Sequence, residues 1–147
     1  MIKYVFIDMD NTIAENTTCL DVEYKEGIYL NKRPVKQIIE AIETLYKDCT
    51  LVILSKAKGG IRGMFEKQAW LEKYFKRVDQ VILMHPDERK SEYIKVFMSV
   101  NGIEPNMCLL IDDKKEILQD CVTIGIDVKY PLQVLCDYND LMQNKGN

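Results

Sequence analysis

The sequence has little of what nitrogen- or sulfur-based metal sites need, and little of what attracts nucleic acids. It contains a single histidine, His85, and five cysteines that form no Cys-x-x-Cys pair. An odd number of widely spaced cysteines argues against both a disulfide framework and a zinc site. The 20 basic residues are outnumbered by 23 acidic ones, the formal net charge is −3, and no basic stripe stands out. We therefore expect no nucleic-acid polymer as a partner.

Long apolar runs are also absent from the sequence. The apolar N-terminal segment stops at Asp8, which makes it too short for a signal peptide or a membrane-spanning helix. We expect a soluble, cytoplasmic protein with reduced cysteines and no membrane partner. Its 147 residues suit one domain, residues 1–147, that is large enough to bury a core.

Short apolar runs alternate with helical patterns along the chain. Runs that are apolar on both faces are typical of parallel strands covered by helices on each side. The pattern predicts an α/β fold with a doubly wound, Rossmann-like parallel sheet of about five strands and helices on both faces. The predicted strands are Lys3 to Ile7, Leu51 to Leu54, Gln80 to Met84, Met107 to Ile111 and a weaker run, Thr123 to Val128.

The intervening segments show helical spacing of apolar residues. Pro34 suits a first helical turn, and a helix is predicted from there to Leu45. Later helices are predicted near residues 93–101, 116–122 and 132–142. The second helix is predicted to bury a broad apolar face, in which Trp70 is interpreted as a core residue rather than a docking surface. That face comprises Met64, Phe65, Ala69, Trp70, Tyr74 and Phe75.

Polar residues follow three of the predicted strands, and ligands in such sheets bind beyond the carboxyl ends of the strands. Carboxylates gathered at one edge repel each other unless a cation intervenes. Oxygen ligands without histidine favour Mg²⁺ as that cation. The residues concerned are Asp8 and Asp10 after the first run, Ser55 and Lys56 after the second, and Asp112 and Asp113 after the fourth.

These motifs resemble those of the haloacid dehalogenase (HAD)-like hydrolase superfamily. The segment from Phe6 to Ala14 resembles the first motif, Leu51 to Ser55 the second, and Leu109 to Asp113 the fourth. The third motif is a lysine near the start of the helix before the fourth strand, and Lys90 fits it. The motifs occur in the family's order and span most of the chain.

The resemblance implies a Mg²⁺-dependent phosphatase. Asp8 would be the nucleophile and would form an aspartyl-phosphate, while Asp10 would protonate the leaving oxygen and then take a proton from water. Family dehalogenases lack an acid at the position of Asp10. The metal site would comprise the carboxylates of Asp8 and Asp112, the backbone carbonyl of Asp10, and an additional acid. We favour Asp113 for that acid, with Glu116 as the alternative.

The resemblance also implies that Thr12, Ser55 and Lys90 bind the phosphoryl oxygens. Lys56 is the alternative to Lys90 as the phosphate lysine, with Lys58 as a further local rival. His85 precedes Pro86 in a predicted loop, and we interpret it as a loop residue without a catalytic part.

Family members usually carry a cap domain over the site, and this chain has little room for one. Residues 13–33 hold only a short flap, with Cys19 to Tyr24 and Gly27 to Leu30 as a possible hairpin. The sequence therefore predicts an enzyme with no large cap domain. An open site would admit a phosphorylated small molecule or a phosphorylated macromolecule, or a homo-oligomer could supply a lid.

The segment from Glu66 to Phe75, together with Leu110 to Asp113, is similar to stretches of the family's 5'(3')-deoxyribonucleotidase branch. A nucleoside monophosphate is therefore our first guess for the substrate. Two alternatives from other classes are a non-catalytic HAD-like binding subunit and a phospho-accepting receiver-type signalling domain. A receiver domain places its acceptor aspartate after the third strand, where this chain has His85 and Pro86.

Overall fold

A computed structural model describes residues 1–15 and 23–146 of the chain. Its five strands form one parallel sheet, as predicted, and their order is β3-β2-β1-β4-β5. The strands are β1 (Tyr4–Ile7), β2 (Thr50–Lys56), β3 (Gln80–Met84), β4 (Cys108–Ile111) and β5 (Asp127–Lys129). The α-helices of the described residues are α1 (Lys36–Leu45), α2 (Gly60–Tyr74), α3 (Lys90–Asn101), α4 (Lys115–Val122) and α5 (Pro131–Lys145), and a 3₁₀ turn, η1 (Pro105–Met107), precedes β4.

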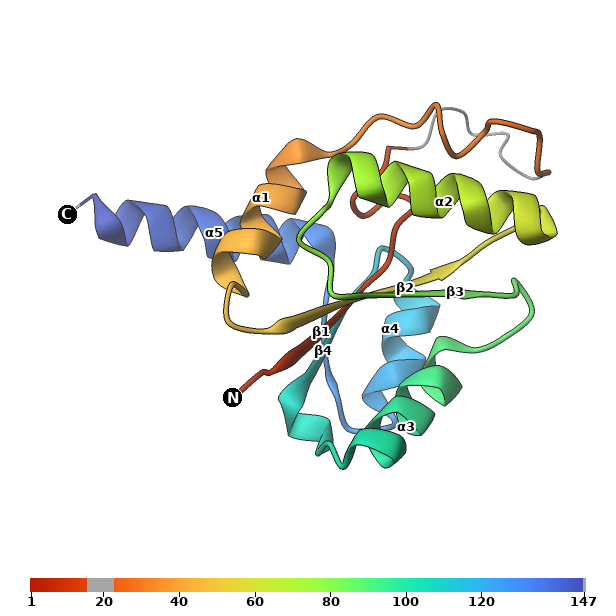
Figure 1. The fold of residues 1–147 in the computed structure, drawn as a ribbon. Coiled ribbons are helices and arrows are strands. Elements are labelled where there is room, and N and C mark those ends of the chain that lie inside the picture. Colours follow the sequence, from red (N-terminus) through yellow and green to blue (C-terminus); the bar gives the residue numbers. More distant parts are fainter. Residues whose placement is uncertain (16–22, 147) are drawn as a thin grey trace.

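Helices cover both faces of the sheet. Figure 1 shows α1, α2 and α5 on one side and α3 and α4 on the other. Successive residues of β1 point to opposite faces, so Val5 and Ile7 pack beneath α1, α2 and α5, while Phe6 packs beneath α3 and α4. Burial on both faces explains why the strands read as continuous apolar runs rather than as alternating ones.

The central position of β1 decides where the polar strand ends meet. β1 pairs with β2 on one side and with β4 on the other. The pairing with β4 continues one residue past the strand, because the Asp8 N–H donates to the Ile111 carbonyl at 2.9 Å. Asp8 therefore lies directly beside Asp112 at the carboxyl edge of the sheet.

Two predicted elements differ from the structure at their ends. The first helix begins at Lys36 rather than at Pro34, because Pro34 forms an isolated bridge with Ala14. The fifth strand covers only Asp127–Lys129, since the chain from Thr123 to Gly125 forms a turn. Gly125 has a φ of +88°, a conformation in which a strand cannot continue.

The predicted hairpin in the flap is wrong where the structure describes it. Residues 27–30 form turns rather than a strand, and Cys19 lies outside the described residues. The tyrosines of this segment pack on α2 and on the loop before it. Tyr24 lies over Gly59, where an added Cβ would come within 2.4 Å of the ring.

Helix α2 buries only part of the face predicted for it. Phe65 is 70% exposed, whereas the charged residues Glu66 and Lys67 are buried. Trp70 is buried in the core, as predicted, and its indole N–H donates to the Lys32 carbonyl at 2.9 Å. The helix is therefore rotated so that two charged side chains face the body of the protein.

No helix among residues 1–15 and 23–146 combines the length and the apolar character that a membrane crossing requires.

We predict that Gly63→Ala destabilises the protein although alanine is the better helix former. A Cβ on Gly63 would lie 1.8 Å from the Lys58 carbonyl oxygen and 3.3 Å from Cε2 of Tyr29. The loss in free energy of unfolding is expected to be about 1–3 kcal/mol, as for other overpacked sites, and urea denaturation measures it.

Gly146→Ala is the matched control for this substitution. Its added Cβ would meet nothing nearer than 3.6 Å, so its effect is expected to stay within about 0.5 kcal/mol. Equal midpoints and slopes for Gly63→Ala and the unsubstituted protein would contradict the close approach at Gly63.

Candidate active site

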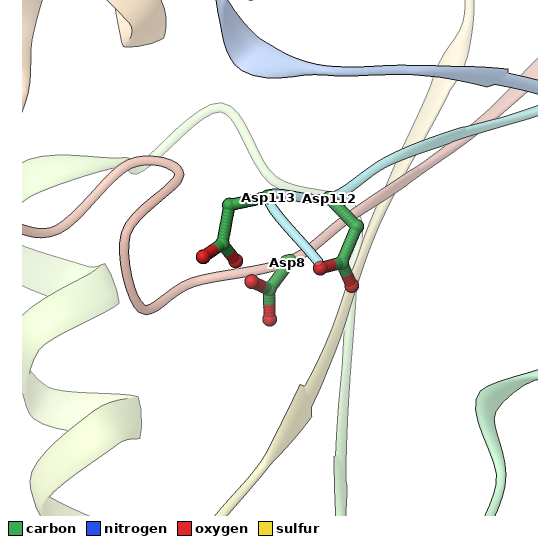
Figure 2. A group of neighbouring side chains, drawn as sticks. All are labelled: Asp8, Asp112 and Asp113. Carbon is green, nitrogen blue, oxygen red and sulfur yellow. The ribbon is translucent and has the colours of Figure 1, made fainter. Parts of the chain in front are cut away.

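Three carboxylates meet where β1 and β4 end. Figure 2 shows Asp8, Asp112 and Asp113 with their carboxyl groups turned toward one another. One carboxylate oxygen from each lies within 4.8 Å of the other two. Asp112 is completely buried and Asp8 is 7% exposed, so neither charge is well hydrated. These three acidic residues, which come from two motifs far apart in the sequence, therefore lie together in the structure.

The electrostatics of this cluster favour a bound cation. Burial, aided by the nearby Asp8, raises the pKa of Asp113 to about 7, and burial next to Asp8 also raises the pKa of Asp112. Within the described residues, Oδ1 of Asp113 is buried and has no hydrogen-bond partner. A hard divalent cation fits this set of oxygen donors, since it would satisfy the orphaned oxygen and offset the repulsion. Glu116, the alternative acid, is exposed on α4.

Lys90 connects the two buried carboxylates of the cluster. Its Nζ lies 2.8 Å from Oδ1 of Asp8 and 2.6 Å from Oδ2 of Asp112. Burial alone would lower the pKa of this lysine, but the two carboxylates more than offset burial and hold the pKa above its ordinary value. Lys90 is the first residue of α3, the position predicted for the third motif.

The residues on either side of Lys90 are tied to one acceptor on α4. The Arg89 guanidinium and the Ser91 hydroxyl both donate to the carboxylate of Asp120. These two contacts fix the start of α3 against α4. They thereby hold the backbone from which the Lys90 side chain reaches between Asp8 and Asp112.

Asp10 lies apart from the acidic cluster and has two lysines of its own. Lys67 Nζ lies 2.7 Å from Oδ2 of Asp10, and Lys32 Nζ lies 2.9 Å from Oδ1. Burial would raise the pKa of Asp10, but the two ammonium groups outweigh burial and keep the pKa below its ordinary value. The carboxyl of Asp10 is thus ionised, and both of its oxygens are held in place.

Lys67 was not predicted as a site residue, although its ammonium group makes further contacts there. It also donates to Oγ of Ser55 and to the Lys56 carbonyl, each at 2.7 Å, and it lies 4.6 Å from the centre of the Tyr29 ring. Its pKa is lowered by complete burial, which the charge of Asp10 only partly opposes. Three acceptors and an aromatic face therefore surround this lysine on α2.

Lys32 was not predicted as a site residue either. For Lys67, however, the sequence does contain a signal. Along α2 the buried residues recur at spacings of three and four, and Glu66 and Lys67 fall within that series. No comparable periodicity marks Lys32, which follows a turn and is placed by the hydrogen bond from Trp70 to its carbonyl.

The remaining predicted residues have more local roles in the structure. Thr12 is buried and its hydroxyl donates to Oδ2 of Asp8 at 3.3 Å. Ser55 is buried within β2 and accepts the hydrogen bond from Lys67, which leaves its own hydroxyl proton available. In the part of the chain that the structure describes, neither Lys56 nor Lys58 forms an ion pair with Asp8 or Asp112 as Lys90 does. His85 is an exposed loop residue, as predicted.

A cavity of about 310 Å³ opens over these side chains. Asp8, Asp10 and Lys90 are among the residues that line it. The turn that carries Asp10 is tight, since Asn11 has a φ of +60° and its N–H donates to the Ala14 carbonyl at 2.8 Å. That turn directs the carboxylates of Asp8 and Asp10 into one cavity, where each carboxylate contacts different lysines.

No model of a protein family matches the chain, and no curated protein matches it in sequence. Solved structures do match it in fold. A haloacid dehalogenase-like family hydrolase from Xanthomonas campestris has a TM-score of 0.70 at 9% identity, and the match covers 99% of this chain and 94% of that one. A haloacid dehalogenase-like family protein from Streptococcus pneumoniae has a TM-score of 0.61 at 14% identity, over 93% of this chain and 98% of that one.

A third match is a phosphatase. The 3-deoxy-D-manno-octulosonate 8-phosphate phosphatase from Moraxella catarrhalis, in complex with a magnesium ion, a phosphate ion and a KDO molecule, has a TM-score of 0.55 at 18% identity. That match covers 81% of this chain and 62% of the phosphatase. At such identities the likeness extends to the fold alone, and the chain has the fold of the haloacid dehalogenase-like hydrolases.

Proposed function

We propose that this chain is a Mg²⁺-dependent phosphatase that hydrolyses a phosphomonoester through an aspartyl-phosphate on Asp8. The observation that carries the proposal is the position of Lys90 Nζ, within hydrogen-bond distance of both Asp8 and Asp112 in a cluster of three carboxylates. A lysine and a cation at one carboxylate suit a phosphoryl group, whose charge both would neutralise. The fold that the chain shares with hydrolases, one of them a phosphatase with bound magnesium and phosphate, supports this assignment.

The carboxylates of Asp8, Asp112 and Asp113 would hold the metal, together with the backbone carbonyl of Asp10. When bound, Mg²⁺ would supply positive charge next to the transferring phosphoryl group. Lys90 would add a second positive charge on the same side. Thr12 would donate a hydrogen bond to Oδ2 of Asp8 and so hold the carboxylate of the nucleophile in one orientation.

In the first half of the reaction, a carboxylate oxygen of Asp8 attacks phosphorus and the bond to the ester oxygen breaks. Asp10, which takes up a proton from solvent when the substrate is bound, gives that proton to the ester oxygen as it leaves. In the second half, water attacks phosphorus, gives a proton to Asp10, and the bond between Asp8 and phosphorus breaks. Inorganic phosphate and the free alcohol are the products.

Lys32 and Lys67 hold Asp10 in the ionised form, which is the form that accepts the proton from water. A bound phosphoryl dianion opposes the two lysines and makes protonation of Asp10 easier, as the first half requires. We assign Lys32 and Lys67 as positioning residues that keep both oxygens of Asp10 in place.

The cavity supports a small substrate more than a macromolecule. Its volume of about 310 Å³ is at the lower end of small-molecule sites, and the proposed nucleophile is one of its lining residues. A nucleoside monophosphate stays our first guess. The single-domain organisation, the cytoplasmic location and a lid from a second copy also stay predictions.

Asp8→Asn is predicted to lower turnover of p-nitrophenyl phosphate with Mg²⁺ by at least about a thousandfold, because the amide cannot act as the nucleophile. Its thermal unfolding should remain cooperative, which separates loss of chemistry from loss of fold. Acid quenching of the unsubstituted protein with radiolabelled substrate should trap phosphate on Asp8. No turnover of any phosphate ester with any divalent metal would instead favour the non-catalytic binding subunit.

The metal ligands can be tested without turnover. At a concentration one hundred times its dissociation constant, Mg²⁺ should stabilise the protein by about 2.7 kcal/mol, seen as a rise in melting temperature. Asp113→Asn should remove most of that rise because it removes a ligand. Glu116→Gln should retain the rise, and the opposite pattern would assign Glu116 as the additional acid.

Lys67→Met is predicted to lower kcat by about 10- to 100-fold, with a smaller effect on KM, since Asp10 loses one of the two contacts that orient it. Lys73→Met is the matched control, because Lys73 is an exposed lysine on the same helix. Steady-state kinetics on both variants, with melting curves to confirm folding, measure the difference. A kcat for Lys67→Met equal to that of Lys73→Met would contradict the positioning role.

A further inference from the structure

The ring of Tyr29 lies against both of the lysines that hold Asp10. Its centre is 4.6 Å from Nζ of Lys67 and 5.7 Å from Nζ of Lys32. All three residues are buried, since Tyr29 is 6% exposed, Lys32 is 4% exposed and Lys67 is fully buried. The face of an aromatic ring attracts an ammonium group, and the attraction is stronger where water is excluded. Tyr29 therefore takes the place of water beside two buried cations.

The ring completes the surroundings of the Lys67 ammonium group. An ammonium group has three N–H bonds to donate. Those of Lys67 find three acceptors at 2.7 Å: Oδ2 of Asp10, Oγ of Ser55 and the Lys56 carbonyl. A ring can cover the ammonium group without taking any of these N–H bonds, whereas a water molecule in the same place would compete as an acceptor. The contact with Tyr29 thus favours the hydrogen bond from Lys67 to Asp10.

Tyr29 is held in place by contacts that do not involve the two ammonium groups. Its hydroxyl accepts a hydrogen bond from the Lys58 N–H at 2.9 Å, in the loop before α2. Gly63 of α2 leaves room for the ring, since an added Cβ there would lie 3.3 Å from Cε2 of Tyr29. The Lys32 N–H donates to the Tyr29 carbonyl at 3.4 Å, so the ring and Lys32 belong to one turn. The backbone around Tyr29 therefore sets the position of the ring.

Tyr29 also separates the cavity from Lys67. Among the residues described, the cavity lining includes Asp10, Tyr29 and Lys32 but not Lys67. The side chain of Asp10 is 30% exposed, whereas that of Lys67 is completely buried. Solvent and substrate can therefore reach Asp10 from the cavity, while the ring shields the lysine behind it.

From this arrangement we infer that Tyr29 is a positioning residue for proton transfer from Asp10 to the leaving oxygen, and that it acts through Lys67 and Lys32. The inference rests on the proposed phosphatase function and adds a residue to it. By keeping both ammonium groups directed at Asp10, the ring keeps the two oxygens of Asp10 in the orientation from which the proton is given to the ester oxygen. Tyr29 gains or loses no proton itself.

The test compares two aryl esters that depend on this proton to different degrees. p-Nitrophenolate leaves readily as an anion, whereas phenolate is more basic and depends more on the proton from Asp10. The ratio of kcat/KM for p-nitrophenyl phosphate to kcat/KM for phenyl phosphate therefore reports how well Asp10 is placed. A variant that only loosens the fold lowers both values and leaves the ratio unchanged.

Three replacements of Tyr29 separate the ring from its hydroxyl. Tyr29→Phe keeps the ring and removes only the acceptor of the Lys58 N–H. Pentafluorophenylalanine at position 29 has nearly the same shape, but its fluorines withdraw electrons from the ring, so its face no longer attracts ammonium groups. Tyr29→Leu removes the ring altogether. Monofluoro- and trifluorophenylalanine complete a graded series.

We expect Tyr29→Phe to keep kcat/KM for both esters within about threefold of the unsubstituted protein, because the ring remains over the lysines. The pentafluoro ring should lower kcat/KM for phenyl phosphate by about tenfold or more, with a smaller loss for p-nitrophenyl phosphate. The ratio should rise along the fluorinated series, and Tyr29→Leu should raise it too.

Tyr138→Leu is the matched control for these variants. Tyr138 is half-buried on α5, and its hydroxyl donates to Glu40. No residue of α5 lines the cavity in the part of the chain that the structure describes. This variant loses a packed ring and a hydrogen bond, as Tyr29→Leu does, and it should leave the ratio of the two esters unchanged.

A double-mutant cycle tests whether Tyr29 acts through Lys67. In a Lys67→Met background, the change from phenylalanine to pentafluorophenylalanine should lower kcat/KM for phenyl phosphate by about threefold at most, since only Lys32 is left to respond. A loss as large as the one measured with Lys67 present would overturn the inference.

Equal ratios for the phenylalanine and pentafluorophenylalanine variants would overturn the inference and leave the phosphatase proposal intact. This comparison decides the matter even if Tyr29→Leu does not fold, because it changes the charge distribution of the ring and hardly its shape. Failure of the unsubstituted protein to release phosphate from either ester with any divalent metal would contradict the proposed function itself. The two failures are therefore distinguishable.

Discussion

The ammonium group of Lys90 lies between the carboxylates of Asp8 and Asp112, and the arrangement of the sheet edge depends on this contact. Burying a carboxylate is strongly unfavourable unless an opposite charge accompanies it. The parallel sheet places Asp8 beside Asp112 through backbone pairing alone, whatever their charges. A lysine from the neighbouring helix is therefore a requirement of this topology as well as of the proposed chemistry.

The same constraint explains helix α2. A helix on an α/β sheet usually turns apolar residues inward, yet here Lys67 is completely buried and Phe65 is exposed. The rotation makes sense because Asp10 is a second partly buried carboxylate, and Lys67 is one of the two cations that compensate it. Gly63 on the buried face allows the Lys58 backbone and Tyr29 to approach. The usual preference of a helix for an apolar buried face is therefore overridden by the need to compensate the charge of Asp10.

Much of the fold and part of the site could be predicted from the sequence. Apolar runs on both faces predicted the parallel sheet, and acids at strand ends predicted the meeting of Asp8 with Asp112, because both signals are local and the topology joins them. Lys67 could not be recognised in the same way, since a lysine in a helix is usually a surface residue. Lys32 follows a turn without periodicity, and its place beside Asp10 depends on tertiary contacts such as the hydrogen bond from Trp70 to its carbonyl.

The tight turn after β1 separates two carboxylates that are only two residues apart. Asp8 faces Lys90, Asp112 and Asp113, whereas Asp10 faces Lys32 and Lys67. Two acids in one environment would share their protons and could not serve as nucleophile and proton carrier at the same pH. Because each has its own cations, a single turn can present both functions to one phosphoryl group.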